Sequence, residues 1–463
     1  MGRGSESLPS VFGVPASTTK SLRVAVLADS DTRWKWGALT ATRIAPADSD
    51  IRLDGYLLRG RATPTARQLE EVGVRADSLR EVTSVEFLRE MAREEDAYDV
   101  VVLSLVGGGV QAMLHGLSHQ WRERSATGST KRPVVVTGYV GVVYEKLADG
   151  LLLRHGADLV LANSRQDADR FTAVYEGVGA DASSVTEVAL PFLGGDPYEK
   201  HDPYTVVFAA QPSVPESRKD RTYLLNRLVQ HARLHPDREV LLKLRSRPGE
   251  HTTHIEEQPY QRLAERIPDG LPANLRLVYG HMGEVLDRTD LLVTVSSTAA
   301  LESLHRRIPT VVLTDLGVRE SLGNHHFVGS GCLASWDQLD DGHIPAPDER
   351  WVARQGVAAG GSATGEGSYE TAFDTARERI AGLLGRGTLP ALAPYYTPVT
   401  APGYLPGVLA RHHLAPDGSP LPGAPDADRE PGPVRQIVRR AARGAYRHGV
   451  QRVAPVIRRM GEL

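Results

Sequence analysis

Three hydroxylic side chains, Ser296, Ser297 and Thr298, stand where the apolar stretch LLVTV gives way to an Ala/Leu-rich run that contains Glu302. This pattern predicts a strand that turns directly into a helix, with free backbone N–H groups and the positive end of the helix dipole at the turn. Such a turn can bind phosphate, and hydroxyl groups add neutral donors. Glu302, one helical turn further along, is suited to accept hydrogen bonds from the vicinal hydroxyls of a ribose. The alternative is a plain serine cap with a solvated carboxylate.

Two cations follow another apolar stretch. Lys243 and Arg245 alternate in KLRS, so in an extended chain their side chains point to the same face. Two positive charges at the end of a buried strand can neutralise a diphosphate. A basic strand end in solvent is the alternative.

Three further polar residues are candidate contacts to the base or the phosphates of the same ligand. Gln211 follows an apolar strand, and Arg218 lies in the loop after it. His325 belongs to GNHHFVGSG, which follows an apolar stretch at the same predicted sheet edge as the Ser/Thr turn. A turn-stabilising amide and a structural histidine are the alternatives for Gln211 and His325.

Carboxylates and aromatic rings cluster after the first apolar stretch of the chain, in ADSDTRWKWG. A carboxylate within hydrogen-bond reach of a hydroxyl can act as the general base of a group transfer, and Asp31 is the first choice for this role and Asp29 the second. Trp34 and Trp36 can stack on a sugar face, and Lys35 can bind an anion. The alternative is that the two Asp residues close a turn and cap the next helix.

Two glycine-interrupted strand ends complete the candidate residues. Gly108 and Gly109 lie in SLVGGGVQAM, which spells G-x-G-x-x-A, but the next strand does not end in the acidic residue of a dinucleotide site. Close approach of the backbone to an acceptor or donor is therefore the better interpretation. Tyr139 and Glu145, in TGYVGVVYEK, are further candidates for binding the acceptor.

Apolar runs alternate with segments of helical period along most of the chain, which is typical of βα units on a parallel sheet. Their near-continuous hydrophobicity fits strands buried on both faces. We expect strands at 22–29, 51–58, 99–106, 133–140, 157–164, 205–211, 239–246, 275–280, 291–297 and 310–316. Two such series predict an α/β fold with two Rossmann-like domains that face each other across a cleft, where the carboxyl ends of parallel strands bind ligands.

Changes in composition divide the chain. Segments dense in Pro, Gly and charge indicate linkers and spacers. We expect a disordered arm at 1–21, an N-terminal Rossmann-like domain at 22–189, a linker at 190–204, a C-terminal Rossmann-like domain at 205–386, a Pro-rich wrap and spacer at 387–433, and a basic amphipathic tail at 434–463.

Bulk composition agrees with two globular domains. The 463 residues exceed what one hydrophobic core usually supports, and 41% apolar and 24% charged residues are ordinary for a folded protein. A single cysteine, Cys332, excludes a disulfide framework, and neither a signal peptide nor a membrane span is apparent. These features predict a cytoplasmic protein.

Charge is unevenly distributed. The last 30 residues carry eight Arg against one acid, Glu462, so this tail is +7 while the rest of the chain is −10. A basic amphipathic helix suits an anionic membrane surface, which predicts peripheral contact with the inner face of the membrane. A plain solvated tail is the alternative. Because the rest of the chain is acidic, we do not expect nucleic acid as a partner.

The segment SSTAALESLHRRIPTVVL (296–313) resembles the nucleotide-binding segment in the C-terminal domain of GT-B glycosyltransferases, especially bacterial capsule and lipopolysaccharide sugar transferases. Over most of its length the chain also resembles an uncharacterised bacterial family of glycosyltransferases. Where related transferases carry His-Pro after the strand-end lysine, this chain has Arg245 and Ser246, so the resemblance does not specify a CMP-sugar donor.

The resemblance implies a glycosyltransferase that moves a sugar from a nucleotide-sugar donor to a cell-surface glycan, a lipid-linked or a small-molecule acceptor. It implies no cofactor and no metal, because dipoles and cations stabilise the leaving diphosphate. One alternative is a non-hydrolysing UDP-sugar 2-epimerase, which shares the architecture. The other is a non-catalytic polysaccharide-assembly protein that keeps the fold as a binding platform.

Overall fold

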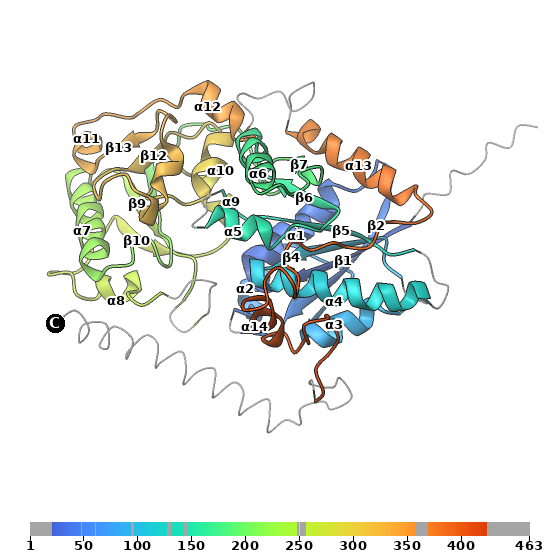
Figure 1. The fold of residues 1–463 in the computed structure, drawn as a ribbon. Coiled ribbons are helices and arrows are strands. Elements are labelled where there is room, and N and C mark those ends of the chain that lie inside the picture. The colour runs from blue at the N-terminus through green and yellow to red at the C-terminus, as the bar shows by residue number, and fades with distance from the viewer. Residues whose placement is uncertain are drawn as a thin grey trace, which may run out of the picture.

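The structure, a computed structural model, describes residues 21–47, 49–60, 62–93, 97–126, 131–142, 146–247, 250, 256–357 and 369–423. Two α/β units lie side by side, each built on its own parallel sheet (Figure 1). The expected arm before Ser21 and the basic tail at 434–463 lie outside the described residues. Within the described ranges, no helix is both long and apolar enough to cross a membrane.

The first unit has seven strands. They are β1 (Ser21–Ala28), β2 (Asp50–Leu58), β3 (Ser78–Val82), β4 (Val100–Ser104), β5 (Val134–Gly138), β6 (Leu159–Ala162) and β7 (Val185–Glu187), in the order β3-β2-β1-β4-β5-β6-β7. The helices between them are α1 (Asp31–Arg43), α2 (Ala66–Val72), α3 (Ser84–Met91), α4 (Gly107–Ala126), α5 (Leu147–Leu152) and α6 (Arg165–Gly177). This strand order is that of a doubly wound Rossmann sheet.

The second unit repeats the pattern with six strands. They are β8 (Thr205–Ala209), β9 (Glu239–Lys243), β10 (Leu275–Val278), β11 (Leu291–Thr294), β12 (Thr310–Leu313) and β13 (Leu333–Ala334), in the order β10-β9-β8-β11-β12-β13. Its helices are α7 (Arg218–Leu234), α8 (Tyr260–Ala264), α9 (Met282–Leu286), α10 (Ala299–His305), α11 (Trp336–Asp340), α12 (Glu349–Arg354) and the 3-10 turns η1 (Glu320–Leu322) and η2 (Asn324–Phe327). The predicted α/β fold with two Rossmann-like domains is confirmed.

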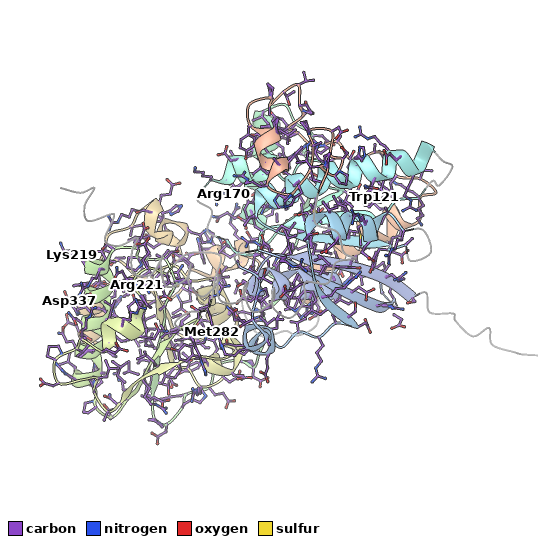
Figure 2. All side chains as sticks on the ribbon, turned by 90° about the horizontal axis from the view of Figure 1, so that it is seen from below. Trp121, Arg170, Lys219, Arg221, Met282 and Asp337 are labelled. Carbon is purple, nitrogen blue, oxygen red and sulfur yellow. The ribbon has the colours of Figure 1, made fainter. Side chains whose placement is uncertain are left out.

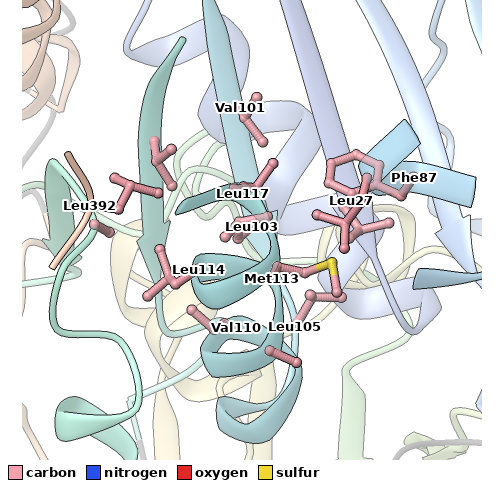
Figure 3. Packing of buried hydrophobic residues seen from close by; sticks show 14 of the residues in the cluster. Leu27, Phe87, Val101, Leu103, Leu105, Val110, Met113, Leu114, Leu117 and Leu392 are labelled. Carbon is pink, nitrogen blue, oxygen red and sulfur yellow. The ribbon is translucent and has the colours of Figure 1, made fainter. Parts of the chain in front are cut away.

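Burial on both faces explains why these segments are strands. All residues of β4 and β5 are buried, as the continuous valine runs predict for central parallel strands. Figure 3 shows the layer formed on one face of the first sheet, where Met113, Leu114 and Leu117 of α4 lie over Leu27 of β1 and Leu103 of β4. Burying apolar surface in this way is the main favourable term in folding.

Several helices begin at side chains that cap them. Thr65 and Thr83 form capping boxes, in which the threonine oxygen accepts the N–H of the third helical residue and Gln68 or Glu86 accepts the threonine N–H. Ser30 caps α1 by accepting the N–H of Arg33 at 3.4 Å. The cap fixes where α1 begins, and therefore which residues sit at the carboxyl edge of the first sheet.

The segment after residue 369 corrects an expected domain boundary. The 3-10 turn η3 (Glu370–Phe373) and helix α13 (Asp374–Leu384) were expected in the second domain, but they pack on the first (Figure 1). Phe373, Ala376 and Ile380 join the apolar core beneath the first sheet, because α13 covers β5 and β7. The physical reason is that these apolar residues extend the layer that Trp34, Trp36 and Ala38 of α1 form on the same face of the sheet.

Residues 387–423 continue over the first domain. The helix α14 (Leu405–Ala410) packs against α4, and Leu392 joins the same apolar layer (Figure 3). His412 adds a polar contact, with its Nδ1 2.8 Å from the Ser84 hydroxyl. The first domain is therefore completed by two segments that follow the second domain in sequence.

The connection at 190–204 has neither helix nor strand, and buried Asp290 of the second domain fixes its far end. The Asp290 carboxylate accepts the N–H of Thr205 at 2.7 Å, the N–H of His201 at 2.8 Å and the Tyr198 hydroxyl at 3.1 Å. Three such bonds satisfy a carboxylate that would otherwise be costly to bury.

Candidate functional site

The carboxyl edges of the two sheets meet, and charged side chains join them. Arg245, just past β9, donates to the Asp31 carboxylate at 2.6 Å and to the Thr32 hydroxyl of α1. A second bridge runs from Arg67 of α2 to the carboxylate of Glu250. Arg245 and Asp31, each predicted at the edge of its own sheet, are therefore brought together at the junction of the domains.

Glu302 is the most unusual group at this junction. Glu302 is only 8% exposed, yet no described residue donates a hydrogen bond to its carboxylate. Burial raises the pKa of Glu302, and the positive charges of Lys35, Arg306 and Lys243 lower it in part. Lys35 belongs to the first domain and the other two cations to the second. A buried acceptor that cations surround but no donor satisfies is suited to a ligand that brings hydroxyl donors.

Lys243 closes β9 and is 6% exposed. Its ammonium donates to the carbonyl of Leu244 at 2.9 Å. Burial lowers the pKa of Lys243 to about 8, and the neighbouring carboxylates of Glu71 and Glu302 oppose this shift. A cation that titrates near neutral pH lies where the sequence predicts contact with a diphosphate.

Asp31, the first choice for a general base, is not free in this arrangement. Arg245 and Asp31 form an ion pair whose side chains are 30% and 12% exposed. While Arg245 donates to this carboxylate, the contacted oxygen is not free to accept a proton from a hydroxyl. The predicted base and a predicted diphosphate ligand therefore neutralise each other across the junction.

Asp29, the second choice, has two hydrogen-bond partners within the first domain. One oxygen accepts from Arg33 at 3.0 Å, and the other accepts the N–H of Val106 at 2.9 Å. These bonds tie the loop after β1 to the start of α4. Ser30, not Asp29, caps α1, so Asp29 has a structural role in joining two βα units.

The Ser/Thr turn follows β11 as expected, and Gln211 supports it. The side-chain oxygen of Gln211 accepts the N–H of Ser296 at 3.1 Å, and the Ser296 hydroxyl donates to the carbonyl of Leu322 at 2.6 Å. Ser297 accepts the N–H of Ala299 at 3.2 Å at the start of α10. Gln211 thus acts as the turn-stabilising amide that the sequence left open.

Thr298 faces the first domain directly. A Cβ atom added at Gly141, in the loop after β5, would lie 3.3 Å from the Thr298 hydroxyl. The turn is therefore in contact with a loop of the opposite domain. Buried Asn163 shapes that loop by donating to the carbonyls of Tyr139 at 2.7 Å and Gly141 at 3.2 Å.

Arg218 is not brought into this cluster, and no described hydrogen bond joins His325 to it. Arg218 is the exposed first residue of α7, and its neighbour Lys219 lies on the outer side of the second domain in Figure 2, away from the first domain. His325 is half-buried in η2, and its Nδ1 has no hydrogen-bond partner in the described part of the chain.

The prediction that Trp34 and Trp36 stack on an acceptor sugar is wrong. Both side chains are fully buried in the core of the first domain. Room for them is made by glycines, since a Cβ atom at Gly55 would lie 2.6 Å from the Trp34 ring and one at Gly138 would lie 2.9 Å from the Trp36 ring. Lys35, between them, does reach the junction, where its ammonium lies 4.9 Å from the centre of the Phe192 ring.

Other residues of the same chain pack against the glycine-rich turn. Added Cβ atoms would meet Val408 at 3.6 Å from Gly108 and His412 at 3.8 Å from Gly109, so α14 and the residues after it make the close approach. This corrects the expectation that an acceptor lies against Gly108 and Gly109.

Tyr139 packs inside the first domain, where the Arg154 guanidinium lies 3.9 Å from the centre of its ring. Its hydroxyl donates to the carbonyl of Leu147 at 3.5 Å. Burial raises the pKa of Tyr139. Glu145 lies outside the described residues.

Two residues at the junction were missed in the sequence. His281 precedes α9, and burial together with the charges of Lys35, Arg306 and Lys243 lowers its pKa. In Figure 2 the next residue, Met282, lies on the side of the second domain nearest the first. Arg306 at the end of α10 donates to the carbonyl of Gly194 at 2.7 Å and pairs with Asp287. A basic residue after the LESLH run was the available signal for Arg306.

Solved structures to which this chain is similar include a UDP complex of S. aureus MnaA, with 13% identity, 78% of this chain and 95% of that chain covered, and a TM-score of 0.48. A UDP-N-acetylglucosamine 2-epimerase has 13% identity, 81% and 99% coverage, and a TM-score of 0.48. Anabaena Alr3699/HepE, in complex with UDP and glucose, has 14% identity, 78% and 97% coverage, and a TM-score of 0.44.

No curated protein matches the sequence. A family match covers residues 24–369, more than half of the chain and parts of both domains. The chain therefore belongs to the family described as "Putative glycosyltransferase (DUF6716)".

Proposed function

We propose that the protein transfers a sugar from a nucleotide-sugar donor bound at the domain junction. The observation that carries this proposal is the Glu302 carboxylate, which is 8% exposed, has no donor among the described residues and lies in the field of three cations. A ribose supplies two vicinal hydroxyl donors for such a carboxylate, while the attached diphosphate supplies negative charge for the cations.

The diphosphate is proposed to bind Lys243 and Arg245, with the hydroxyls of the Ser296–Thr298 turn as neutral donors. Lys243 and Arg245 follow the same strand, and Lys243 is within electrostatic reach of Glu302. These groups would stabilise the negative charge that develops on the leaving diphosphate, so the proposed reaction uses neither metal nor cofactor.

The acceptor is proposed to approach from the first domain, with Asp31 as the general base. Arg245 holds Asp31 at 2.6 Å, and a bound diphosphate competes for the same guanidinium. Donor binding would then release the Asp31 carboxylate to accept the proton of an attacking hydroxyl. The proposed acceptor is a cell-surface glycan, a lipid-linked saccharide or a small molecule. We further propose that transfer takes place in the cytoplasm, with residues 434–463 bound to the anionic inner face of the membrane.

Nucleotide binding tests the donor site. A thermal-stability screen of the full chain against UDP, GDP, CDP, dTDP and CMP should show one nucleotide that raises the melting temperature, because a ligand of the native state stabilises it. Glu302→Ala should abolish that rise, while the exposed Arg218→Ala should keep it. If no nucleotide stabilises the wild-type chain, the proposed donor site is wrong.

Product analysis tests the reaction. With the matching nucleotide sugar and an acceptor extract, a transferase releases free nucleotide in proportion to glycosylated product. An epimerase converts the nucleotide sugar without an acceptor and without releasing nucleotide during turnover. Conversion to an isomeric nucleotide sugar would replace the proposed transfer with epimerisation.

A further inference from the structure

A second group of side chains with metal-binding chemistry lies far from the domain junction. His231 lies in the last turn of α7, His235 is the residue that caps the end of this helix, and Asp340 ends α11. One nitrogen from each imidazole and one oxygen of the carboxylate all lie within 4.8 Å of one another. Two imidazoles at this helical spacing can bind one ion from the same face of a helix.

The hydrogen bond to Asp340 fixes the tautomer of His231. The Nδ1 atom of His231 lies 2.7 Å from the Asp340 carboxylate, and an ionised carboxylate only accepts, so Nδ1 carries the proton. The lone pair of His231 is then on Nε2. Histidines that bind metals in proteins are oriented in this way by a carboxylate on the opposite ring nitrogen.

Both outward nitrogens lack partners. The Nε2 atoms of His231 and His235 are buried and have no hydrogen-bond partner among the residues that the structure describes, although the two ring centres are only 4.6 Å apart. His231 is completely buried. An unsatisfied acceptor in such a position is unusual in a native protein, and a cation between the rings would satisfy it.

The surroundings of the two rings carry charges of both signs. The charged groups that act on the two rings or pair with Asp340 include the cations Arg227 and Arg238. Facing them are the carboxylates Asp237, Asp337 and Asp340.

We propose that His231 and His235, with the His231 ring oriented by Asp340, form a binding site for a divalent transition-metal ion of the Zn²⁺ class. Imidazole nitrogen suits Zn²⁺, Ni²⁺, Co²⁺ or Cu²⁺ and not Mg²⁺ or Ca²⁺, which take oxygen ligands. Zinc bonds to imidazole nitrogen of about 2.0–2.1 Å require the rings to close on the ion. His235 is half-buried at the end of α7, so its side chain can turn to do this.

The proposed ion has a structural role. It would link α7 to α11, where Trp336 packs 5.4 Å from the His231 ring. Both helices lie on the side of the second domain farthest from the first (Figure 1). The site therefore stabilises the second domain and takes no part in the proposed transfer.

Zinc titration of the full chain tests the site. Calorimetric titration of metal-free protein with ZnCl₂ at pH 7.5 should show one more bound equivalent in the wild-type chain than in His235→Gln. Asp340→Asn should weaken that equivalent about tenfold or more, because it removes the group that orients His231. Zn²⁺ should raise the melting temperature of the wild-type chain, and the same concentration of Mg²⁺ should not.

A matched control is available on α4, where the His119 Nε2 lies 3.3 Å from Glu123 at the same helical spacing. His119→Gln should keep the wild-type zinc stoichiometry and the rise in melting temperature. Circular dichroism of His235→Gln shows whether it is folded, and Asp340→Asn provides an independent variant. Equal zinc stoichiometry and affinity in the wild-type chain and both site variants would overturn the proposal.

Discussion

Replacing Asp31 by Asn should tighten nucleotide binding while lowering turnover. The substitution removes the carboxylate that Arg245 contacts at 2.6 Å, so the guanidinium no longer has to leave a charged partner when a diphosphate arrives. The pair is partly solvated, with side chains 30% and 12% exposed, which places its strength at about 1 kcal/mol, the upper end for exposed ion pairs. That corresponds to about fivefold tighter binding of the nucleoside diphosphate.

Turnover should change in the opposite direction. Loss of a general base costs about 10²-fold to 10⁴-fold in rate. Calorimetry gives the affinity for the nucleotide that the stability screen identifies, and release of that nucleotide from its sugar gives the rate. Thr32→Val is the matched control, since it removes the other partner of Arg245 and keeps the carboxylate. If Asp31→Asn binds nucleotide more weakly than wild type, or turns over at the wild-type rate, the proposed exchange at Arg245 is wrong.

Four other outcomes are expected. Glu302→Gln should weaken binding of the nucleoside diphosphate about tenfold or more, because hydrogen bonds to a charged acceptor contribute about 1.5–3 kcal/mol, while calorimetry should show inorganic diphosphate binding unchanged. Nucleotide affinity should fall as pH rises through about 8, where Lys243 loses its charge. Lys243→Arg should remove this pH dependence. The same pH dependence of affinity in Lys243→Arg and in the wild-type chain would contradict this prediction. Phe373→Ala, which empties a site 1% exposed in the first domain, should lower the free energy of unfolding by about 3–5 kcal/mol in urea denaturation. Deleting residues 434–463 should abolish co-sedimentation with anionic vesicles and leave nucleotide affinity intact, whereas retained sedimentation would remove the tail from the proposed membrane contact.

Raising the pH through about 8 should change stability and nucleotide binding in opposite directions, because both depend on the charge of Lys243. The pKa of Lys243 is lowered to about 8 in the folded state, so between pH 8 and the unfolded value the unfolded chain binds more protons. Below pH 8 the buried ammonium charge lowers the free energy of unfolding. As the pH rises above 8 the ammonium loses its proton and the free energy of unfolding increases. A site that gives up stability to keep a cation buried is consistent with a ligand-binding role.

The central strands could be predicted because each is a continuous apolar run buried on both faces. All ten expected strands are present, with ends shifted by a few residues. The three strands that were missed, β3, β7 and β13, lie at sheet edges. Four of the five residues of β3 are exposed, and β7 and β13 contain three and two residues, so none carries an apolar run long enough to be distinguished from a loop.

The candidate site was only partly predictable, for reasons of packing. Arg245 and Asp31 meet because parallel strands present their carboxyl ends at one edge, which the order of elements already implies. The burial of Trp34 and Trp36 depends on glycines in strands of other βα units, and the sequence does not show which ring faces which glycine. Glycines inside apolar strands were the available signal for a close-packed ring.

The return of the chain to the first domain has a consequence for synthesis. The ribosome makes the whole second domain before it makes Phe373, Ala376 and Ile380, which cover part of the first sheet. Until then the apolar residues that α13 covers lack this helix, and the first domain reaches its full stability only after α14, with Leu405 and Leu409, has also been made. Two chain crossings, before β8 and after α12, then join the domains, and any relative rotation must leave both crossings intact.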